Sequence, residues 1–248
     1  MNHYIHDSVQ LGDNVKIGHF SVIEEDVVIG DNVVIGNNVT IHAGTVVGNN
    51  VSIADNSVIG RWPKPAKTST VKVDAELPPL RLGDGCNIGA NVVLYRGSIF
   101  GDEVMIGDLA SVREKCEIGR NVVIGRGVAV ENQVKIGEYT KIQTNAYITA
   151  YTTLEDHVFI APTVTTTNDN FMGRTKERFK FVKGPYVKRG ARVGGGSILL
   201  PGVTVAEESF VAAGALIHRD TEPAKLYVGV PAKPLRDVPD REKLENQE

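Results

Sequence analysis

Aliphatic residues recur at every sixth position along most of this chain. The pattern runs unbroken from residue 5 to 59, returns from 82 to 160 with one Phe among the aliphatic residues, and returns again from 187 to 217. An α-helix would repeat its apolar face about every 3.6 residues and a simple strand about every 2, so neither fits. A short strand followed by a corner, repeated many times, does fit.

Two further features of the hexad predict how each corner is made. The position four residues after each aliphatic residue carries mainly Val, Ser or Thr, which predicts a second inward-facing side chain. Gly often follows the aliphatic residue directly, and Asn often stands three places after it. Asn tolerates the left-handed backbone region better than most residues, so these positions predict tight corners. The asparagines concerned are Asn14, Asn32, Asn38, Asn50, Asn56, Asn91 and Asn121.

Thirty hexads of this kind predict an all-β prism built from short parallel strands. With three hexads in each triangular coil and a rise of ~4.8 Å per coil, the prism has about ten coils and a length on the order of 50 Å. We expect this β-helix to span residues 1–218, followed by a tail over 219–248. The pattern breaks at 61–81 and 168–186, which predicts two ejected loops, and loops on a rigid scaffold often carry function.

The composition agrees with a soluble protein that has an aliphatic core. Hydrophobic residues make up 42% of the chain and aromatic residues only 6%. The net charge of −3 argues against a general affinity for nucleic acid. No stretch has the length of a membrane span and no signal peptide is visible, so we expect a cytoplasmic protein. Cys86 and Cys116 indicate neither a disulfide framework nor a metal site by their spacing, and we predict small core or turn residues there.

The hexad resembles the repeat of the hexapeptide-repeat acyltransferases, and the resemblance covers roughly residues 5 to 236. That family folds as a left-handed parallel β-helix, so the resemblance implies this hand. The period of six alone does not determine the hand of the helix. The general preference of parallel crossover connections is for the right hand.

Segment 160–174 is more specifically similar to the sugar-nucleotide N-acetyltransferases of that family. Segments 194–202 and 228–233 are similar to that group and to hexapeptide acetyltransferases generally. Segment 160–174 contains Thr-Asn-Asp followed by Arg174, segment 194–202 begins Gly-Gly-Gly, and segment 228–233 reads Val-Gly-Val-Pro-Ala-Lys. The resemblance implies transfer of an acetyl group from acetyl-CoA to the amino group of a nucleotide-linked sugar. It also implies that the pantetheine arm lies along a prism edge, in a cleft between two subunits of a homotrimer.

By the same resemblance, five residues are expected to bind CoA. Small residues would line the edge along which the pantetheine arm lies, and a lysine would stand near the CoA phosphates. These residues are Gly194, Gly195, Ala212, Ala213 and Lys233.

Outward-facing valines also favour an oligomer. Their positions predict prism faces that are more apolar than solvated strands usually are, and burial around a threefold axis would cover them. The valines are Val28, Val34, Val46, Val58 and Val122.

Asn168 and Asp169 are the predicted catalytic residues. An unprotonated amine is a good nucleophile, so an amide or carboxylate that orients it can replace a strong base. A backbone N–H would stabilise the oxyanion that forms on the thioester. The alternative is that Asn-Asp only starts a turn. Tyr147 and Tyr151 are predicted to reach the sugar, although tyrosine is also common on exposed strand faces.

Each loop carries residues that suit phosphorylated ligands. In the first loop, Trp62 with Lys64 and Lys67 is predicted to stack on a base or contact pyrophosphate, or else to cover apolar surface. Basic residues in and after the second loop would bind phosphates, with a solvated loop as the alternative. They are Arg174, Lys176, Arg178, Lys180, Lys183, Lys188, Arg189 and Arg192.

The histidines weigh on the competing functions. Hexapeptide acetyltransferases that act on hydroxyls usually carry a catalytic His in the loop that here reads Thr-Asn-Asp. No His is present in that loop here, which disfavours O-acetylation. His157 stands one place later than the His of the sialic-acid and bacillosamine type, so we expect it to contact substrate or to be structural. A zinc carbonic anhydrase would need a His pair spaced by five, which this chain lacks, and we therefore predict no metal site. A non-enzymatic scaffold is disfavoured because it needs neither loop.

Overall fold

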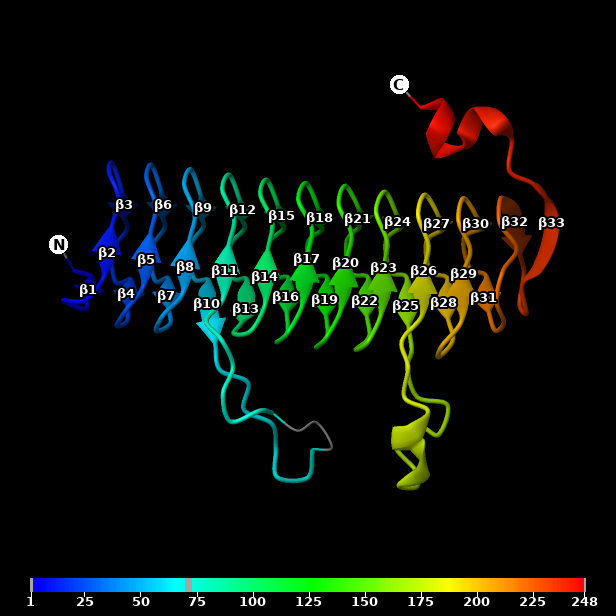
Figure 1. The fold of residues 1–248 in the computed structure, drawn as a ribbon, viewed down its shortest axis with the longest axis horizontal. Coiled ribbons are helices and arrows are strands. Elements are labelled where there is room, and N and C mark those ends of the chain that lie inside the picture. Colours follow the sequence, from blue (N-terminus) through cyan, green and yellow to red (C-terminus); the bar gives the residue numbers. More distant parts are fainter. Residues whose placement is uncertain (1, 70–72, 248) are drawn as a thin grey trace.

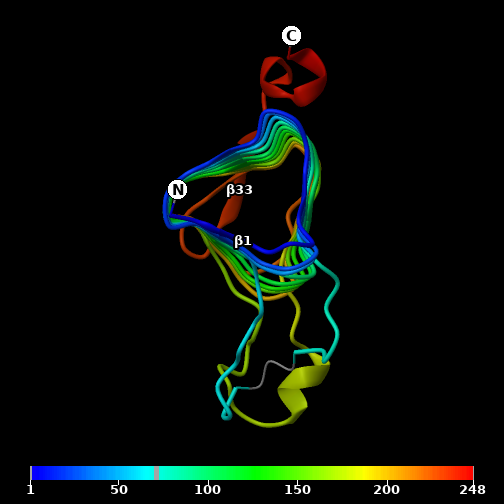
Figure 2. The same cartoon turned by 90° about the vertical axis from the view of Figure 1, so that its left-hand side faces the viewer.

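The computed structural model describes residues 2–69 and 73–247. The chain forms a triangular prism with one parallel sheet on each of its three sides (Figures 1 and 2). We call these sheets A, B and C, with 11, 10 and 12 strands respectively. Each edge of the prism is named by the two sheets that the chain joins there, so that the chain passes from sheet A to sheet B at the A/B edge.

Nearly all strands are two residues long, and each strand from β1 to β28 pairs with the strand three places later in the sequence. Sheet A contains β1 (Tyr4–Ile5), β4 (Val22–Ile23), β7 (Thr40–Ile41), β10 (Val58–Arg61), β13 (Val93–Tyr95), β16 (Ser111–Val112), β19 (Ala129–Val130), β22 (Tyr147–Ile148), β25 (Thr165–Thr166), β28 (Ile198–Leu199) and β31 (Leu216–Ile217). Sheet B contains β2 (Gln10–Leu11), β5 (Val28–Ile29), β8 (Val46–Val47), β11 (Arg81–Leu82), β14 (Ile99–Phe100), β17 (Glu117–Ile118), β20 (Lys135–Ile136), β23 (Thr153–Leu154), β26 (Tyr186–Val187) and β29 (Thr204–Val205). Sheet C contains β3 (Lys16–Ile17), β6 (Val34–Ile35), β9 (Ser52–Ile53), β12 (Asn87–Ile88), β15 (Met105–Ile106), β18 (Val123–Ile124), β21 (Lys141–Ile142), β24 (Phe159–Ile160), β27 (Arg192–Val193), β30 (Phe210–Val211), β32 (Lys225–Val228) and β33 (Lys233–Asp237).

The prism is a left-handed coil. In Figure 1 the chain crosses sheet A at the bottom, climbs sheet B at the front and returns over sheet C while it advances toward the C-terminus. Seen from the N-terminal end in Figure 2, this path turns counter-clockwise as it recedes. The predicted all-β fold and the hand implied by the resemblance are both confirmed.

The β-helix is slightly longer than the aliphatic pattern predicted. β25 is an additional strand before the second loop, and β32 extends sheet C beyond the expected end at residue 218. The aliphatic pattern does not include β25 because polar Thr166 fills its inward position. Its hydroxyl accepts the N–H of Thr149 (2.7 Å) and donates to the carbonyl of Tyr147 (3.1 Å), so this side chain is fully buried without an unpaired polar atom.

Both ejected loops are present, with bounds that differ slightly from the prediction. The first lies between β10 and β11, and we call residues 62–80 the first loop. Arg61 and Arg81, predicted as loop residues, belong to these strands, and Leu80 is fully buried. The second lies between β25 and β26, and we call residues 167–185 the second loop; it contains the short 3-10 helix η1 (Glu177–Lys180).

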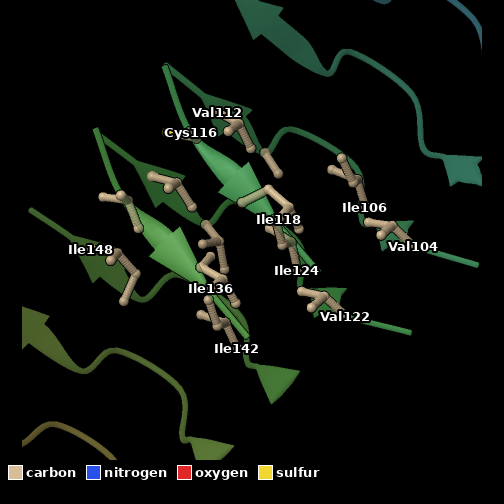
Figure 3. Packing of buried hydrophobic residues seen from close by; sticks show 14 of the residues in the cluster. Val104, Ile106, Val112, Cys116, Ile118, Val122, Ile124, Ile136, Ile142 and Ile148 are labelled. Atoms are coloured by element: carbon tan, nitrogen blue, oxygen red, sulfur yellow. The ribbon is translucent and has the colours of Figure 1, made fainter. Parts of the chain in front are cut away.

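The core is a column of aliphatic side chains that fills the prism from end to end. The second residue of each two-residue strand points inward, and Figure 3 shows such residues stacked coil upon coil. Inward Ser and Thr are also fully buried, among them Ser21, Thr45 and Ser57. Val122, predicted to face outward, is fully buried instead. It stands four places after Ile118, which is the second inward position of the hexad, and its neighbour Val123 takes the outward position.

The corners explain the recurrent Asn and Gly. All seven predicted asparagines have left-handed backbones, with φ between 54° and 62°. At the corner of Gly48, a Cβ would stand 2.5 Å from Oδ1 of Asp84 in the next coil. That oxygen accepts the backbone N–H of Asn49 (2.7 Å), so only Gly leaves room for the bond between coils.

The C-terminal segment folds back on the prism. β33 pairs antiparallel with β32, and the short 3-10 helices η2 (Asp240–Glu242) and η3 (Leu244–Asn246) follow it. The Leu244 N–H donates to Glu208 at the B/C edge (3.0 Å), and Arg192 on sheet C pairs with Glu242 (3.3 Å).

Two expectations from composition concern the interior and membranes. Cys86 and Cys116 are both buried and free, as predicted for small core residues. Within residues 2–69 and 73–247, no helix has the length and apolar character needed to cross a membrane.

Two adjacent valines offer a direct test of the inward and outward assignment. Val122→Ala removes two methyl groups from the core and should lower the free energy of unfolding by about 2 kcal/mol. Val123→Ala, on the outer surface, should cost less than about 0.5 kcal/mol. Urea unfolding followed by circular dichroism measures both, and equal losses would contradict the assignment.

Candidate functional site

Both loops leave the prism at the same edge. Each follows a strand of sheet A and precedes a strand of sheet B, and both hang from the A/B edge in Figures 1 and 2. They are five coils apart, or roughly 24 Å at ~4.8 Å per coil. One loop therefore lies at each end of the intervening stretch of this edge.

A cleft of about 780 Å³ lies along this edge beside the second loop. Its volume falls in the range of pockets that hold small molecules, about 300–1,000 Å³. The walls combine charged, amide, hydroxyl and aromatic side chains. They are formed by Glu131, Asn132, Gln133, Tyr147, Thr149, Ala150, Tyr151, Asn168, Asp169, Arg178, Phe179 and Val182. Four of the residues predicted from sequence meet here: Asn168, Asp169, Tyr147 and Tyr151.

Asp169 holds the second loop in shape. Its carboxylate accepts the N–H groups of Phe171 and Gly173, each at 2.9 Å, and pairs with the Arg178 guanidinium. The hydrogen bond from Gly173, then that from Phe171 and the Arg178 charge, hold the pKa of this carboxyl below its usual value. The turn proposed as the alternative for Asn-Asp is thus present, and its carboxylate also forms part of the cleft wall.

Asn168 joins the second loop to the neighbouring coil. Its side-chain amide donates to the Ala150 carbonyl (3.4 Å), and its backbone carbonyl accepts the N–H of Lys183 (3.0 Å), which closes the base of the loop. Asn168 also lines the cleft, so it can contact a bound molecule.

Glu131 is a candidate catalytic residue that sequence reasoning missed. Arg113 donates to Glu114 at 2.8 and 3.0 Å and lies 3.5 Å from Glu131. Burial raises the pKa of the Glu131 carboxyl above its ordinary value; Arg113 opposes this rise and the Glu114 charge adds to it. A carboxylate with a raised pKa in a cleft is suited to accept a proton.

Tyr147 stands beside Glu131 in the cleft wall and shares its environment. Burial, and then the charge of Glu131, raise the pKa of its hydroxyl, while Thr149 lowers it. Tyr147 is therefore a neutral hydroxyl near neutral pH, able to donate a hydrogen bond to a ligand.

The sequence did carry a signal for this edge. The place after the inward aliphatic residue is Gly in many hexads. At the A/B edge, however, successive coils carry large or polar residues there instead: Tyr95, Arg113, Glu131, Thr149 and Thr167.

The remaining predicted residues lie apart from this cleft. Trp62 belongs to the first loop, where the Arg96 guanidinium lies 4.7 Å from its ring centroid. Arg174 lies in the second loop but is exposed and does not line the cleft. His157 lies at the B/C edge, where it has the left-handed backbone (φ 57°) that Asn provides in other coils. Its Nδ1 lies 3.0 Å from Asp156, and its ring stacks on Tyr139 with centroids 5.0 Å apart.

The five residues predicted for CoA lie near one another at the C-terminal end of the C/A edge. Gly194 and Gly195 form one corner, and Ala212 and Ala213 form the corner of the next coil. A Cβ on Gly194 would stand 2.5 Å from the Ala213 nitrogen, so the two corners stack closely. Lys233 is exposed and begins β33, directly after Ala232, whose N–H donates to the Leu216 carbonyl (2.9 Å) beyond these corners.

The basic stretch divides into paired and exposed residues. Lys188 pairs with Glu207 (3.1 Å) and Arg189 pairs with Asp156 (2.8 Å). Arg178 and Arg192 also have acidic partners, as described above. Lys176 is among those that remain exposed. Over residues 2–69 and 73–247, no three His, Cys, Asp or Glu side chains are grouped so that they could hold a metal ion.

Family profiles match the repeats along the chain. The profile described as bacterial transferase hexapeptide (six repeats) matches residues 8–43, 26–61 and 97–132. The hexapeptide repeat of succinyl-transferase matches residues 79–108. The chain is therefore a hexapeptide-repeat protein with the left-handed β-helix fold.

Individual relatives match over shorter parts of their lengths. A protein of Schizosaccharomyces pombe, assigned by its name to the acetyltransferases, is 50% identical over 46 residues, or 18% of this chain and 22% of its own length. The galactoside O-acetyltransferase of Escherichia coli is 29% identical over 94 residues, or 37% of this chain and 46% of its own length. The chain thus spans less than half the length of these two relatives.

Among solved structures, the UDP-N-acetylglucosamine acyltransferase of Francisella novicida is similar in fold. The TM-score is 0.58 at 21% identity, and the match covers 94% of this chain and 68% of that one. This similarity shows the fold and leaves the chemistry to be argued from the site.

Because the Asp169 carboxylate holds the second loop together, we expect this loop to be less ordered when the Asp169 charge is removed. Asp169→Asn weakens the contact with Arg178, so limited proteolysis should cut within 167–185 several-fold faster than in wild type. Asn170→Ala, at the exposed neighbouring position, is the matched control and should leave the rate unchanged.

The same contact should depend on pH in a defined direction. Because the pKa of Asp169 is lowered in the folded loop, protection is complete above the ordinary aspartate value of about 3.9 and is lost as the pH falls through the lowered pKa. Amide protection factors over 167–185, corrected for the intrinsic pH dependence of exchange, should fall over this pH range. Protection factors that stay constant would contradict the stabilising role of Asp169.

Proposed function

We propose that this protein is an acyltransferase that moves an acetyl group from acetyl-CoA to the amino group of a nucleotide-linked sugar. The observation that carries the proposal is the cleft at the A/B edge. There a carboxylate with a raised pKa, two tyrosines and the Asn168 amide face one space beside the second loop. The fold and the hexapeptide repeats, which relatives named as acetyltransferases share, support the acyl-transfer class.

The chemistry assigns a role to each of these groups. The sugar nitrogen attacks the thioester carbonyl as Glu131 accepts a proton from it, and a carbon–nitrogen bond forms. The carbon–sulfur bond then breaks, and the departing thiolate takes up the proton that Glu131 accepted, which gives the free thiol and returns Glu131 to its ionised form. Asn168 and Tyr147 orient the sugar, and Asp169 keeps the second loop in place through Arg178.

The expected donor site lies at a different edge of the same prism. The corners at Gly194 and Gly195 and at Ala212 and Ala213 present small residues, which let a pantetheine arm approach the backbone closely. Because the A/B and C/A edges are separated by the width of sheet A, one chain does not place donor and acceptor together. We therefore propose a homotrimer in which the C/A edge of one subunit faces the A/B edge of its neighbour.

O-acetylation of a hydroxyl is the second candidate. The similarity to the galactoside O-acetyltransferase favours it, since this relative is named for that reaction. Against it, the second loop contains no His to deprotonate a hydroxyl. An amine is the acceptor that a carboxylate base serves best, because a sugar ammonium loses its proton far more readily than a hydroxyl does.

Turnover tests the proposal directly. A thiol-release assay with acetyl-CoA against UDP- and dTDP-linked amino sugars should show turnover with at least one sugar. Glu131→Gln should lower kcat by about 100-fold or more, as for loss of a general base. Asn168→Ala should also lower turnover. Glu117→Gln, at an exposed carboxylate paired with Lys135 on sheet B, is the matched control.

The pH profile separates a base from a merely structural carboxylate. Glu131 accepts a proton only when ionised, and its pKa is raised, so kcat/KM should increase with pH through an apparent pKa above the ordinary value of about 4.3. Glu131→Gln should abolish that part of the profile. An unchanged profile in a folded variant, or turnover with hydroxyl sugars alone, would contradict the N-acetyltransferase proposal.

Assembly is a separate prediction. Analytical ultracentrifugation should give a trimer at micromolar concentration, because neither edge alone holds both substrates. A stable monomer that retains full activity would exclude the shared cleft.

A further inference from the structure

A second, smaller pocket lies on the same edge, at the base of the first loop. Its volume is about 150 Å³, and it is lined by Arg61, Lys64, Pro65, Ser69, Tyr95 and Arg113. Pockets for whole small molecules begin at about 300 Å³, so this one is sized for a single group of a larger ligand. Three of its six lining residues are cationic, which indicates that this group is an anion.

The Tyr95 ring organises the two guanidinium groups. Arg61 lies 5.6 Å and Arg113 lies 5.3 Å from its centroid. Tyr95 pairs in register with Arg61 on one side, and Arg113 extends from the next coil on the other. The aromatic ring thus holds two like charges at one site. Planar guanidinium groups fixed in this way suit the bidentate binding of phosphate oxygens.

The charges around this pocket leave an excess of positive charge. Arg113 is balanced by Glu114 and Glu131, and Lys115 pairs with Asp74 of the first loop. Within the described ranges 2–69 and 73–247, neither Arg61 nor Lys64 has an ion pair. These two cations are available to a ligand, and Arg113 adds a guanidinium that is already positioned.

Arg113 also connects this pocket with the cleft. It lines the small pocket, and its partner Glu131, at 3.5 Å, lines the cleft. Tyr95 and Glu131 are two coils apart along the edge, roughly 10 Å at ~4.8 Å per coil. A phosphate held at Tyr95 would therefore place a sugar attached to it near Glu131 and Tyr147.

We propose that Arg61, Lys64 and Arg113, arranged around Tyr95, form the subsite that binds the diphosphate of the acceptor. This inference rests on the proposed function, because it takes the acceptor to be a nucleotide-linked sugar. It fixes the direction in which that molecule lies. The diphosphate binds at the first loop, and the sugar points along the edge toward the second loop.

Calorimetry with the 248-residue chain tests this subsite without turnover. The probes are UDP, inorganic pyrophosphate and uridine. UDP should bind, pyrophosphate should compete with it, and uridine should bind far more weakly. Arg61→Gln and Lys64→Gln should each weaken UDP binding about tenfold, as for loss of one charge-assisted contact. Lys16→Gln, an exposed lysine on sheet C opposite the A/B edge, is the control and should bind UDP as wild type does.

The outcomes separate this subsite from the proposed reaction. Weaker UDP binding in Lys64→Gln but not in Lys16→Gln supports the subsite, even if no amine is acetylated. Equal UDP affinity in wild type, Arg61→Gln and Lys64→Gln overturns it, as does uridine binding as tightly as UDP. If turnover with a nucleotide-linked amino sugar persists alongside equal affinities, the reaction stands and the diphosphate lies elsewhere. Where both hold, Lys64→Gln should raise KM for the nucleotide-sugar and leave kcat nearly unchanged.

Discussion

In-register stacking of one coil on the next, at a step of 18 residues, is the constraint on which the rest of this structure depends. Backbone hydrogen bonds join each coil to its neighbour on all three sides, so every coil must keep the same cross-section. The second residue of nearly every two-residue strand is confined to the core, and the Gly and Asn corners allow the close approach of successive coils. An insertion is tolerated only at a corner, where the chain can leave and return without breaking a ladder.

This constraint explains why the candidate chemistry gathers at one edge. The sheets present short, repetitive strands, whereas the A/B edge carries both loops and a column of charged and aromatic residues. Coil stacking places these residues about 5 Å apart along the edge. Residues 18 positions apart in sequence, such as Arg113 and Glu131, thereby become direct neighbours. A linear series of contacts of this kind suits an extended acceptor such as a nucleotide-linked sugar.

The fold was predictable from sequence because the repeat is both local and regular. The period of six, the inward positions and the left-handed asparagines all follow from short-range chemistry, and the structure confirms them. The edge from which each loop leaves was not predictable in the same way. Thr166 occupies an aliphatic position, and missing that one hexad shifts the second loop from the A/B edge to the C/A edge. Because the buried Thr166 hydroxyl has two hydrogen bonds, a polar residue is tolerated at this inward position. The sequence pattern therefore did not predict that both loops leave from the same edge.

The site was only partly predictable, for a related reason. Asn168 and Asp169 were found through family resemblance, and Tyr147 and Tyr151 through their place just before the second loop. All four line the cleft. Glu131 was missed because its raised pKa arises from burial beside Glu114 and Arg113, and that environment exists only once coils are stacked. Asp169 acts through contacts with Gly173 and Arg178, which depend on how the second loop folds.

The central claim is that the A/B edge binds the acceptor and the C/A edge binds the donor. Hydrogen–deuterium exchange with the protein alone, with CoA, and with a UDP-linked amino sugar tests it most directly. The account predicts that the sugar nucleotide slows exchange at the A/B edge, at 131–133 and in the second loop, while CoA slows exchange at 194–196 and 212–214. Protection by both ligands at sites away from these two edges, with none at either, would contradict the account.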